Sequence, residues 1–392
     1  MTRRSVPLLA LAGVVALLMT AGCSGSDARS GSTTSSTRAA TPKTAPVPGA
    51  EWKHVAPAAV GLDAAKLDEI AGVAEQAKSR CLVVVRGGQI AGEWYFGGTG
   101  PHSAQDVFSV TKSVSSTLVG IAQDDGDLRV ADRASRWIPE WKHTPADAVT
   151  VRDLLSNDSG REWSLGIDYV QLLRSKDRTA FAVDLAQAAP PGTVWAYNNS
   201  AIQTLQPVVH GATGDDVAAF ARSRMFAPLG MRDTEMTDDA SGSTQMFEGL
   251  HSTCRDLARF GVLFLDRGRW GSERIVSTDW VDAATGRSST ELNAAYGYLW
   301  WLNREGVLAG VRAATSVEGA ADASRARGRL VPGAPASMFW ALGLGNQVVQ
   351  VDPGSGTVVV RLGPARSSQP TFGPAQASRV VTEAVTGPVP VR

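Results

Sequence analysis

Apolar residues recur along this chain with two different periods, one typical of helices and one typical of strands. Between residues 61 and 79 they fall at helical spacing, which predicts an amphipathic helix. The next segment, CLVVVRGGQIAGEWYFGG from Cys81, has two β-rich runs around the turn RGG and predicts a hairpin. A further helix is expected within 106–126, where one apolar stripe comprises Val110, Val114, Leu118 and Ile121.

The rest of the pattern is mostly helical from about 131 to 300, and strand-like runs return only near the C-terminus. These late runs are ASMFWALGLG, NQVVQVDP and GTVVVRLG, and a closing helix is expected across AQASRVVTEAV. Strands at both ends with helices between them predict an α+β fold. Its antiparallel sheet would combine N- and C-terminal strands, flanked by helices, with an inserted, mostly helical subdomain. The polar segment 304–337 is either a mobile flap beside a site or a surface excursion.

The first 23 residues have a different composition from the rest. Arg3 and Arg4 precede the apolar run VPLLALAGVVALLMTAG, and no acidic residue occurs there, which is typical of an export signal. The small residues before Cys23 resemble the lipobox of bacterial lipoproteins, although Thr20 replaces the usual leucine. We therefore expect a signal peptide at 1–22 and a lipidated Cys23. The alternative is an ordinary secretory signal with a coincidental cysteine.

Residues 23–50 contain mainly Ser, Thr, Gly, Ala and Pro, with almost nothing to bury, and predict a flexible tether. A tether after a lipid anchor suits a domain at 51–392 held on the outer face of a bacterial cytoplasmic membrane. Such an oxidising location allows Cys81 and Cys254 to form a disulfide. Both lie in apolar contexts, so two buried free thiols are the alternative.

Composition excludes several classes of function. Lys plus Arg and Asp plus Glu both number 38, so no basic field is present to attract nucleic acid. The five histidines show no metal-ligand spacing, and neither GxSxG nor HExxH occurs. We therefore expect no nucleic-acid partner, no metal and no cofactor.

Ser109 and Lys112 are the first candidates for chemistry. Residues three apart on a helix share a face, so the Lys112 amine can reach the Ser109 hydroxyl. Lysine can activate a serine only if its pKa falls toward neutrality, which burial and a helix N-terminus both favour. The alternative is a surface lysine that lies near a serine by chance.

Further motifs accompany this pair. FSVTKS resembles the SxxK nucleophile motif of serine β-lactamases and penicillin-binding proteins. YNN at 197–199, after PGTVWAY, is similar to the YxN motif of the class C β-lactamase and DD-carboxypeptidase branch. With YGYLWW and ALGLGNQ, the likeness extends to 6-aminohexanoate-dimer hydrolases and related esterases, and it covers roughly 60–390.

The resemblance implies a β-lactamase/transpeptidase-like fold and assigns four catalytic residues. Ser109 would be the acylated nucleophile, Lys112 its proton acceptor and Tyr197 the proton shuttle to the leaving group. Asn199 would orient Lys112 or the substrate amide. Which of Lys112 and Tyr197 is the base at each step stays open. Without the resemblance, Tyr197 is equally a core tyrosine and Asn199 a helix N-cap or turn residue.

One family element departs from the pattern. Where relatives carry KTG or HTG, this chain has Ala341, Leu342 and Gly343, so that strand offers no cation for a substrate carboxylate. Gly343 and Gly345 would still allow close approach, and the N–H groups of Leu344 and Ser109 would form an oxyanion hole. The alternative is that both glycines only shape a strand.

These expectations combine into a serine hydrolase. It would form an acyl-enzyme on an uncharged ester or amide, taken from a small-molecule or peptide substrate. The alternatives are a DD-carboxypeptidase or weak β-lactamase acting on cell-wall peptides, and a catalytically silent surface binding protein. Four tryptophans flank the motifs and line an acyl pocket or pack in the core: Trp195, Trp300, Trp301 and Trp340.

Overall fold

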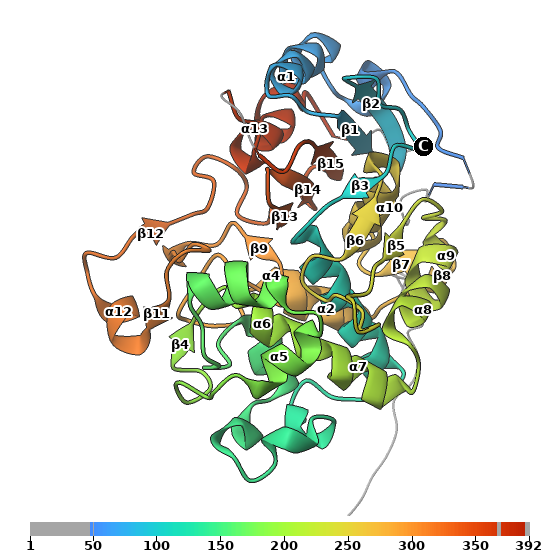
Figure 1. Cartoon of the computed structure of the whole chain (residues 1–392). Helices are drawn as coiled ribbons and strands as arrows, with labels where there is room; N and C mark the ends of the chain where they lie inside the picture. The colour runs from blue at the N-terminus through green and yellow to red at the C-terminus, as the bar shows by residue number, and fades with distance from the viewer. Residues whose placement is uncertain (1–47, 50, 367–369, 389–392) are drawn as a thin grey trace, which may run out of the picture. The chain divides into compact units, whose positions relative to one another are not determined.

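The computed structural model describes residues 48–49, 51–366 and 370–388 (Figure 1). The expected signal peptide, the lipidation site Cys23 and nearly all of the expected tether lie outside the described residues and stay predictions. Within the described ranges, no helix has both the length and the apolar character needed to cross a membrane.

A six-stranded antiparallel sheet joins the two ends of the described chain, as predicted. Its strand order is β2-β1-β15-β14-β13-β9. In the centre β1 pairs with β15, and Cys81 lies opposite Leu362. The bounds are Cys81–Arg86 (β1), Gln89–Tyr95 (β2), Trp301–Leu302 (β9), Phe339–Gly343 (β13), Gln347–Asp352 (β14) and Thr357–Leu362 (β15).

The predicted N-terminal hairpin is confirmed. Gly87 and Gly88 connect β1 to β2 with φ angles of 58° and 70°, a left-handed conformation that glycine adopts without steric cost. A bulge between Val84 and Val85 shifts the register of the pair. In the sheet, β1 therefore lies between β2 and β15.

Helices cover both faces of the central strands. Cβ on Gly261 of α10 (Cys254–Leu265) would touch Val358 and Val349, whereas the Gln350 amide donates to a carbonyl of α13 (Pro374–Arg379). Because neighbouring residues of a strand point to opposite faces, α10 and α13 lie on opposite sides of β14 (Figure 1). Every residue of β1, β14 and β15 is therefore buried.

The closing helix is present as α13, and so are the two helices predicted in the N-terminal part. The first is α1 (Ala64–Gln76), whose N-terminus is capped by the Asp63 carboxylate. The second is α2 (Val110–Asp124). The single apolar stripe predicted for α2 is incomplete, because all residues from 110 to 122 are buried. The hydroxyls of Ser113 and Ser115 are satisfied by the carbonyls of Leu299 and Met246, so α2 runs through the interior.

The inserted region is mainly helical, as expected. Its helices are Val151–Ser156 (α3), Leu172–Arg174 (α4), Arg178–Asp184 (α5), Asn199–Gln203 (α6), Leu205–Thr213 (α7), Val217–Ala221 (α8), Ala227–Leu229 (α9), Thr278–Val281 (α11) and Val317–Ala321 (α12).

The expectation that strands return only near the C-terminus is wrong. Strands of two or three residues occur throughout the middle of the chain, and β9 even joins the main sheet. Strands this short leave no readable alternation in a sequence. The others are Gln105–Asp106 (β3), Val194–Trp195 (β4), Glu235–Met236 (β5), Leu250–Ser252 (β6), Arg269–Trp270 (β7), Glu273–Arg274 (β8), Gly306–Val307 (β10), Thr315–Ser316 (β11) and Arg327–Gly328 (β12).

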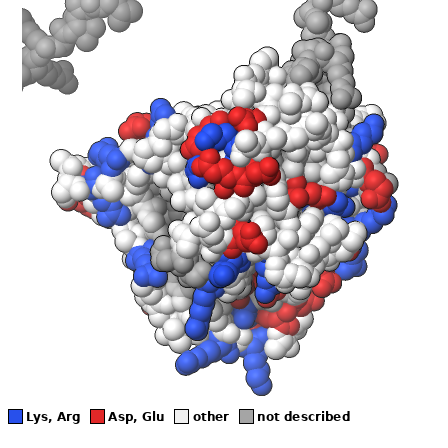
Figure 2. All heavy atoms as spheres, turned by 90° about the horizontal axis from the view of Figure 1, so that it is seen from above, with Lys and Arg blue, Asp and Glu red and all other residues white. Residues whose placement is uncertain are grey.

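On one face of the molecule, charged groups of both signs lie among a larger area of other residues (Figure 2). This mixture agrees with the formal net charge of zero.

Cys81 and Cys254 form a disulfide, so the alternative of two free thiols is wrong. The bond joins β1 to the first residue of α10 across a sequence separation of 173. A cross-link that closes so long a loop restricts the unfolded chain strongly. It therefore ties the N-terminal hairpin to the helix that covers the sheet.

We expect the Cys81→Ala/Cys254→Ala variant to lose roughly 2–5 kcal/mol of unfolding free energy, measured by urea denaturation against wild type. In a Cys23→Ala background, thiol titration of the denatured, unreduced protein should find no free thiol. Two free thiols there, or equal stability of the double variant, would contradict the assigned bond.

Candidate active site

Ser109 stands at the N-cap position of α2, at the end of a sharp turn. Phe108 has φ of 49°, which is rare for a residue other than glycine. The Thr111 hydroxyl donates to the Phe108 carbonyl and accepts from the Leu250 N–H, which holds this turn. The Ser109 side chain makes no capping hydrogen bond, so its hydroxyl is available to other partners.

The Lys112 amine reaches that hydroxyl. Its Nζ lies 2.9 Å from Ser109 Oγ and also donates to the Phe247 carbonyl at 2.9 Å, and the residue is 1% exposed. Burial lowers the pKa of Lys112 to about 7, while the charges of Glu248 and Asp168 act in the opposite direction. A substantial fraction of Lys112 is therefore a neutral amine near pH 7.

Tyr197 meets the same serine from another element. Its ring stacks on Trp301 with centroids 5.6 Å apart, and Lys112 Nζ lies 4.7 Å from the ring centroid. Burial raises the pKa of Tyr197 far above its usual value, and a hydrogen bond with Ser109 opposes that rise only in part. The resting phenol is therefore protonated, and Lys112 loses its proton first.

Asn199 is the first residue of α6, and the N-cap position belongs to its neighbour Asn198, whose side chain accepts from the Ala201 N–H. The alternative N-cap role for Asn199 is thus taken by the residue before it. Within the described ranges, Asn199 Oδ1 is buried without a hydrogen-bond partner. The Lys112 amine donates to Ser109 and Phe247, so the expected orientation of Lys112 by Asn199 is not seen.

Asp168 is a site neighbour that the sequence did not reveal. Its buried carboxylate accepts the Asn199 N–H at 2.5 Å and the Ser200 hydroxyl at 2.7 Å, at the start of α6. Burial raises its pKa, while Lys112 is among the groups that lower it. No local signal could have found Asp168, because it lies 31 positions before its partner.

A second missed neighbour is the Phe247–Glu248 pair. The Phe247 carbonyl holds Lys112, and the Glu248 carboxylate forms an ion pair with Arg178 at 2.8 Å. Arg178 also lies over the Phe247 ring, with 5.8 Å between the guanidinium carbon and the ring centroid. These residues follow no recognisable motif, and only the fold brings them to Lys112.

The end of β13 passes directly beside the turn that carries Ser109. A Cβ on Gly343 would lie 2.2 Å from the Val107 carbonyl oxygen, so only glycine permits this approach. Gly345 has φ of 79° and is similarly crowded by Pro364. Close backbone packing therefore requires both glycines, and a role of this strand toward a substrate stays a prediction. Among the described residues, neither the Ser109 N–H nor the Leu344 N–H donates a hydrogen bond.

The tryptophans near the motifs pack in the core. Trp195, Trp300 and Trp340 are fully buried among other rings and strands, and the Trp340 indole donates to Gln350. Trp301, by contrast, stacks on the Tyr197 ring. The structure thus favours the packing interpretation over an acyl pocket for the first three.

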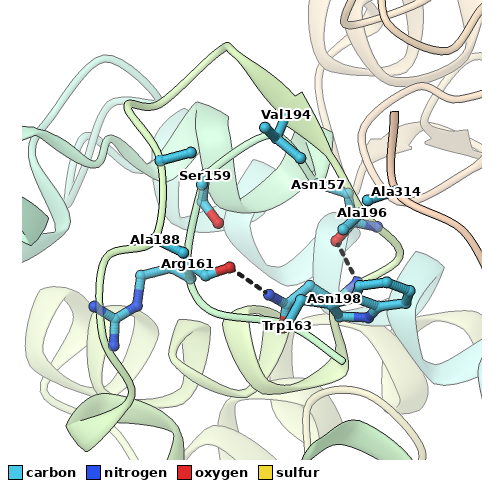
Figure 3. A pocket seen from close by; sticks show the side chains of 11 residues that line it. Asn157, Ser159, Arg161, Trp163, Ala188, Val194, Ala196, Asn198 and Ala314 are labelled. Carbon is cyan, nitrogen blue, oxygen red and sulfur yellow. Dashed lines mark hydrogen bonds between the residues drawn. The ribbon is translucent and has the colours of Figure 1, made fainter. Parts of the chain in front are cut away.

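A cavity of about 220 Å³ lies beside the Tyr197 segment (Figure 3). Asn198 crosses its wall, with hydrogen bonds to Asn157 and to the Arg161 carbonyl. Ser109 and Lys112 do not line it. Its lining comprises Asn157, Ser159, Gly160, Arg161, Trp163, Ala188, Ala189, Val194, Ala196, Asn198 and Ala314.

The segment 304–337 also approaches Tyr197. Its strand β11 pairs with β4, and Thr315 lies opposite Trp195, two residues before Tyr197. The segment is therefore tied to the site and is more than a surface excursion. In the part of the chain that the structure describes, no group of His, Cys, Asp or Glu side chains is arranged to hold a metal ion.

Comparison with known proteins agrees with this geometry. The family model described as Beta-lactamase matches residues 63–375. The 6-aminohexanoate-dimer hydrolase of Paenarthrobacter ureafaciens is 25% identical over 63% of this chain and 71% of its own length. The esterase EstB of Burkholderia gladioli is 34% identical over 32% of this chain and 36% of its own length.

A solved structure supports the fold. The octameric penicillin-binding protein homologue from Pyrococcus abyssi superposes with a TM-score of 0.58 at 17% identity, and the match covers 81% of this chain and 76% of that one. The expected β-lactamase/transpeptidase-like α+β fold is thereby confirmed. Since the family model matches most of the sequence, the resemblance expected from the motifs is confirmed as well: the chain belongs to the β-lactamase family.

Proposed function

We propose that this protein is a serine hydrolase in which Ser109 is acylated by an uncharged ester or amide. The observation that carries the proposal is the 2.9 Å contact between Lys112 Nζ and Ser109 Oγ, made by a buried amine whose pKa is about 7. A serine hydroxyl is a weak nucleophile, and an adjacent neutral amine is the base that activates it.

In the proposed acylation step, neutral Lys112 takes the Ser109 proton as Oγ attacks the carbonyl carbon. The negative charge that develops on the carbonyl oxygen is stabilised by the N–H groups of Ser109 and Leu344. Tyr197, a protonated phenol at rest, donates to the leaving group and recovers a proton from Lys112. Water then attacks the carbonyl carbon of the acyl-enzyme and gives its proton to the Lys112–Tyr197 pair. The same pair returns a proton to Ser109 Oγ as the acyl group leaves.

The composition of β13 supports an uncharged substrate. Ala341 and Leu342 stand where relatives place a cation, so a substrate carboxylate has no partner on this strand. β-Lactams and D-alanyl-D-alanine peptides carry such a carboxylate. A DD-carboxypeptidase or weak β-lactamase is therefore the second candidate, and a hydrolase and an esterase among the relatives support the first.

We expect a fluorophosphonate probe to add its mass to Ser109 in the folded protein, because only an activated serine reacts readily. Peptide mass spectrometry checks the site of the adduct. Ser109→Ala should lose the adduct and at least about 1,000-fold of esterase activity, whereas Ser103→Ala, a change at an exposed serine, should keep both.

The absence of an adduct on Ser109 in folded protein would favour a catalytically silent binding protein. Parallel assays with p-nitrophenyl acetate and nitrocefin separate the two enzyme candidates. Fast nitrocefin turnover without ester hydrolysis would place the DD-carboxypeptidase or β-lactamase candidate first.

Because the base must be neutral, kcat/KM for p-nitrophenyl acetate should rise with pH through about 7, the pKa of Lys112. The Glu248 charge raises that pKa, as does Asp168, so Glu248→Gln should move the midpoint of the rise to lower pH. Glu273→Gln, a change at an exposed residue of β8, should leave the midpoint in place. A midpoint that Glu248→Gln leaves unchanged would argue against Lys112 as the base.

Gly343→Ala should slow acylation of Ser109, because the new methyl group pushes β13 away from the Val107 carbonyl and displaces the Leu344 N–H. Overpacking of this kind typically costs about 1–3 kcal/mol in stability. The matched control is Gly72→Ala in α1, where no heavy atom lies within 4 Å of the new Cβ. That variant should acylate normally. Normal probe kinetics in folded Gly343→Ala would rule out the proposed role of β13.

A further inference from the structure

The large apolar side chains that the described residues expose gather on three segments of the chain. Their exposed fractions run from 36% at Leu173 to 61% at Leu344. We call these seven residues the apolar rim: Leu165, Tyr169, Val170, Leu173, Val311, Val317 and Leu344.

The first segment is a helical run over 165–174, which includes the π-helical turn Ile167–Gln171 and α4. Its inner side carries the buried Asp168 carboxylate, which accepts the N–H of Asn199. Rim residues 165, 169 and 173 recur every four positions, so they share the outer face. A hydrogen bond between Tyr169 and the Asn199 side chain lowers the pKa of the Tyr169 phenol, although burial raises it overall. This face therefore borders the YxN motif.

The other two segments approach the same motif. Val311 and Val317 flank β11, which pairs with β4 just before Tyr197. The exposed Arg312 acts on the Tyr169 phenol by its charge, so this segment faces the first one. Leu344 follows Gly343, whose Cα lies against the Val107 carbonyl in the turn before Ser109. All three rim segments therefore lie next to elements that carry Ser109, Tyr197 or Asn199.

Exposed apolar side chains are common singly, but a set gathered on segments next to one site is typical of a surface that binds apolar material. β13 contributes no charged side chain to this border, since it offers Ala341 and Leu342. An extended hydrocarbon chain would cover the rim side chains and remove them from water.

We propose that the apolar rim binds the hydrocarbon chain of the substrate, which is an uncharged ester or amide with a medium or long apolar chain. This inference rests on the proposed function, because the chain is placed by its bond to the carbonyl that acylates Ser109. The substrate class is therefore lipophilic, and a carboxylate at the far end of the chain should weaken binding because it loses water on an apolar surface.

The test compares kcat/KM along two ester series below their solubility limits. One lengthens the acyl group, from p-nitrophenyl acetate to octanoate, and the other lengthens the alcohol, from ethyl to octyl acetate. A fully buried CH₂ contributes a factor of about 4, so we expect at least about a 30-fold rise along one series. The p-nitrophenyl half-ester of the eight-carbon dicarboxylic acid should lose most of that rise.

Two variants locate the effect. Leu165→Ser/Val170→Ser and Val317→Ser change exposed side chains, so both should fold, and both should lower the octyl-to-short ratio several-fold. The control Ala65→Ser changes an exposed residue of α1, outside the rim, and should keep the wild-type ratio.

Equal kcat/KM values along both ester series would overturn the inference. An octyl-to-short ratio that the rim variants leave unchanged would overturn it as well. A third result would also overturn it: rim variants that keep the octyl-to-short ratio but no longer sediment with phosphatidylcholine vesicles. That result would assign the rim to binding a membrane surface. The proposed function fails separately: without a Ser109 adduct it is wrong, whereas an adduct with flat ester series overturns the rim alone.

Discussion

The hydrogen bond between Lys112 and Ser109 is the constraint on which the rest of the site depends. A lysine that is 1% exposed cannot keep its charge without cost, and this cost is what brings its pKa to about 7. The desolvation comes from the packing around α2, whose residues 110–122 are all buried, whereas Ser109 at its start is partly exposed. A more exposed helix would leave Lys112 protonated and unable to serve as a base.

Three distant parts of the chain complete that environment. Tyr197 lies just before α6, and the Phe247 carbonyl lies in the loop before β6. Gly343 allows the end of β13 to pack against the turn that carries Ser109. The sheet that carries β13 is joined to α10 by the disulfide through β1. Stability and site geometry therefore share the same elements, and a shift of the sheet relative to α2 would change both.

The lack of charge on β13 and the exposed apolar side chains near the site both favour the uncharged substrate proposed above. The strand β13 presents Ala341 and Leu342, neither of which carries a charge, while segments next to the elements of the site expose large apolar side chains. Inside the site, Asp168 and Glu248 partly offset the desolvation of Lys112 and so set how basic the amine is. The proposed chemistry at Ser109 and the proposed selection of the substrate thus rest on separate groups.

The sequence by itself determined the elements whose signals are local: the hairpin, α1, the late strands and the three-residue spacing of Ser109 and Lys112, because periodicity and turn chemistry act between near neighbours. The tertiary structure alone decided the Cys81–Cys254 pairing, the burial of α2 on every side, and the roles of Asp168 and Glu248 as neighbours of Lys112. It also decided the two- and three-residue strands such as β9. Each of these depends on residues far apart in the chain meeting in a packed interior, and no short stretch of sequence encodes such a meeting.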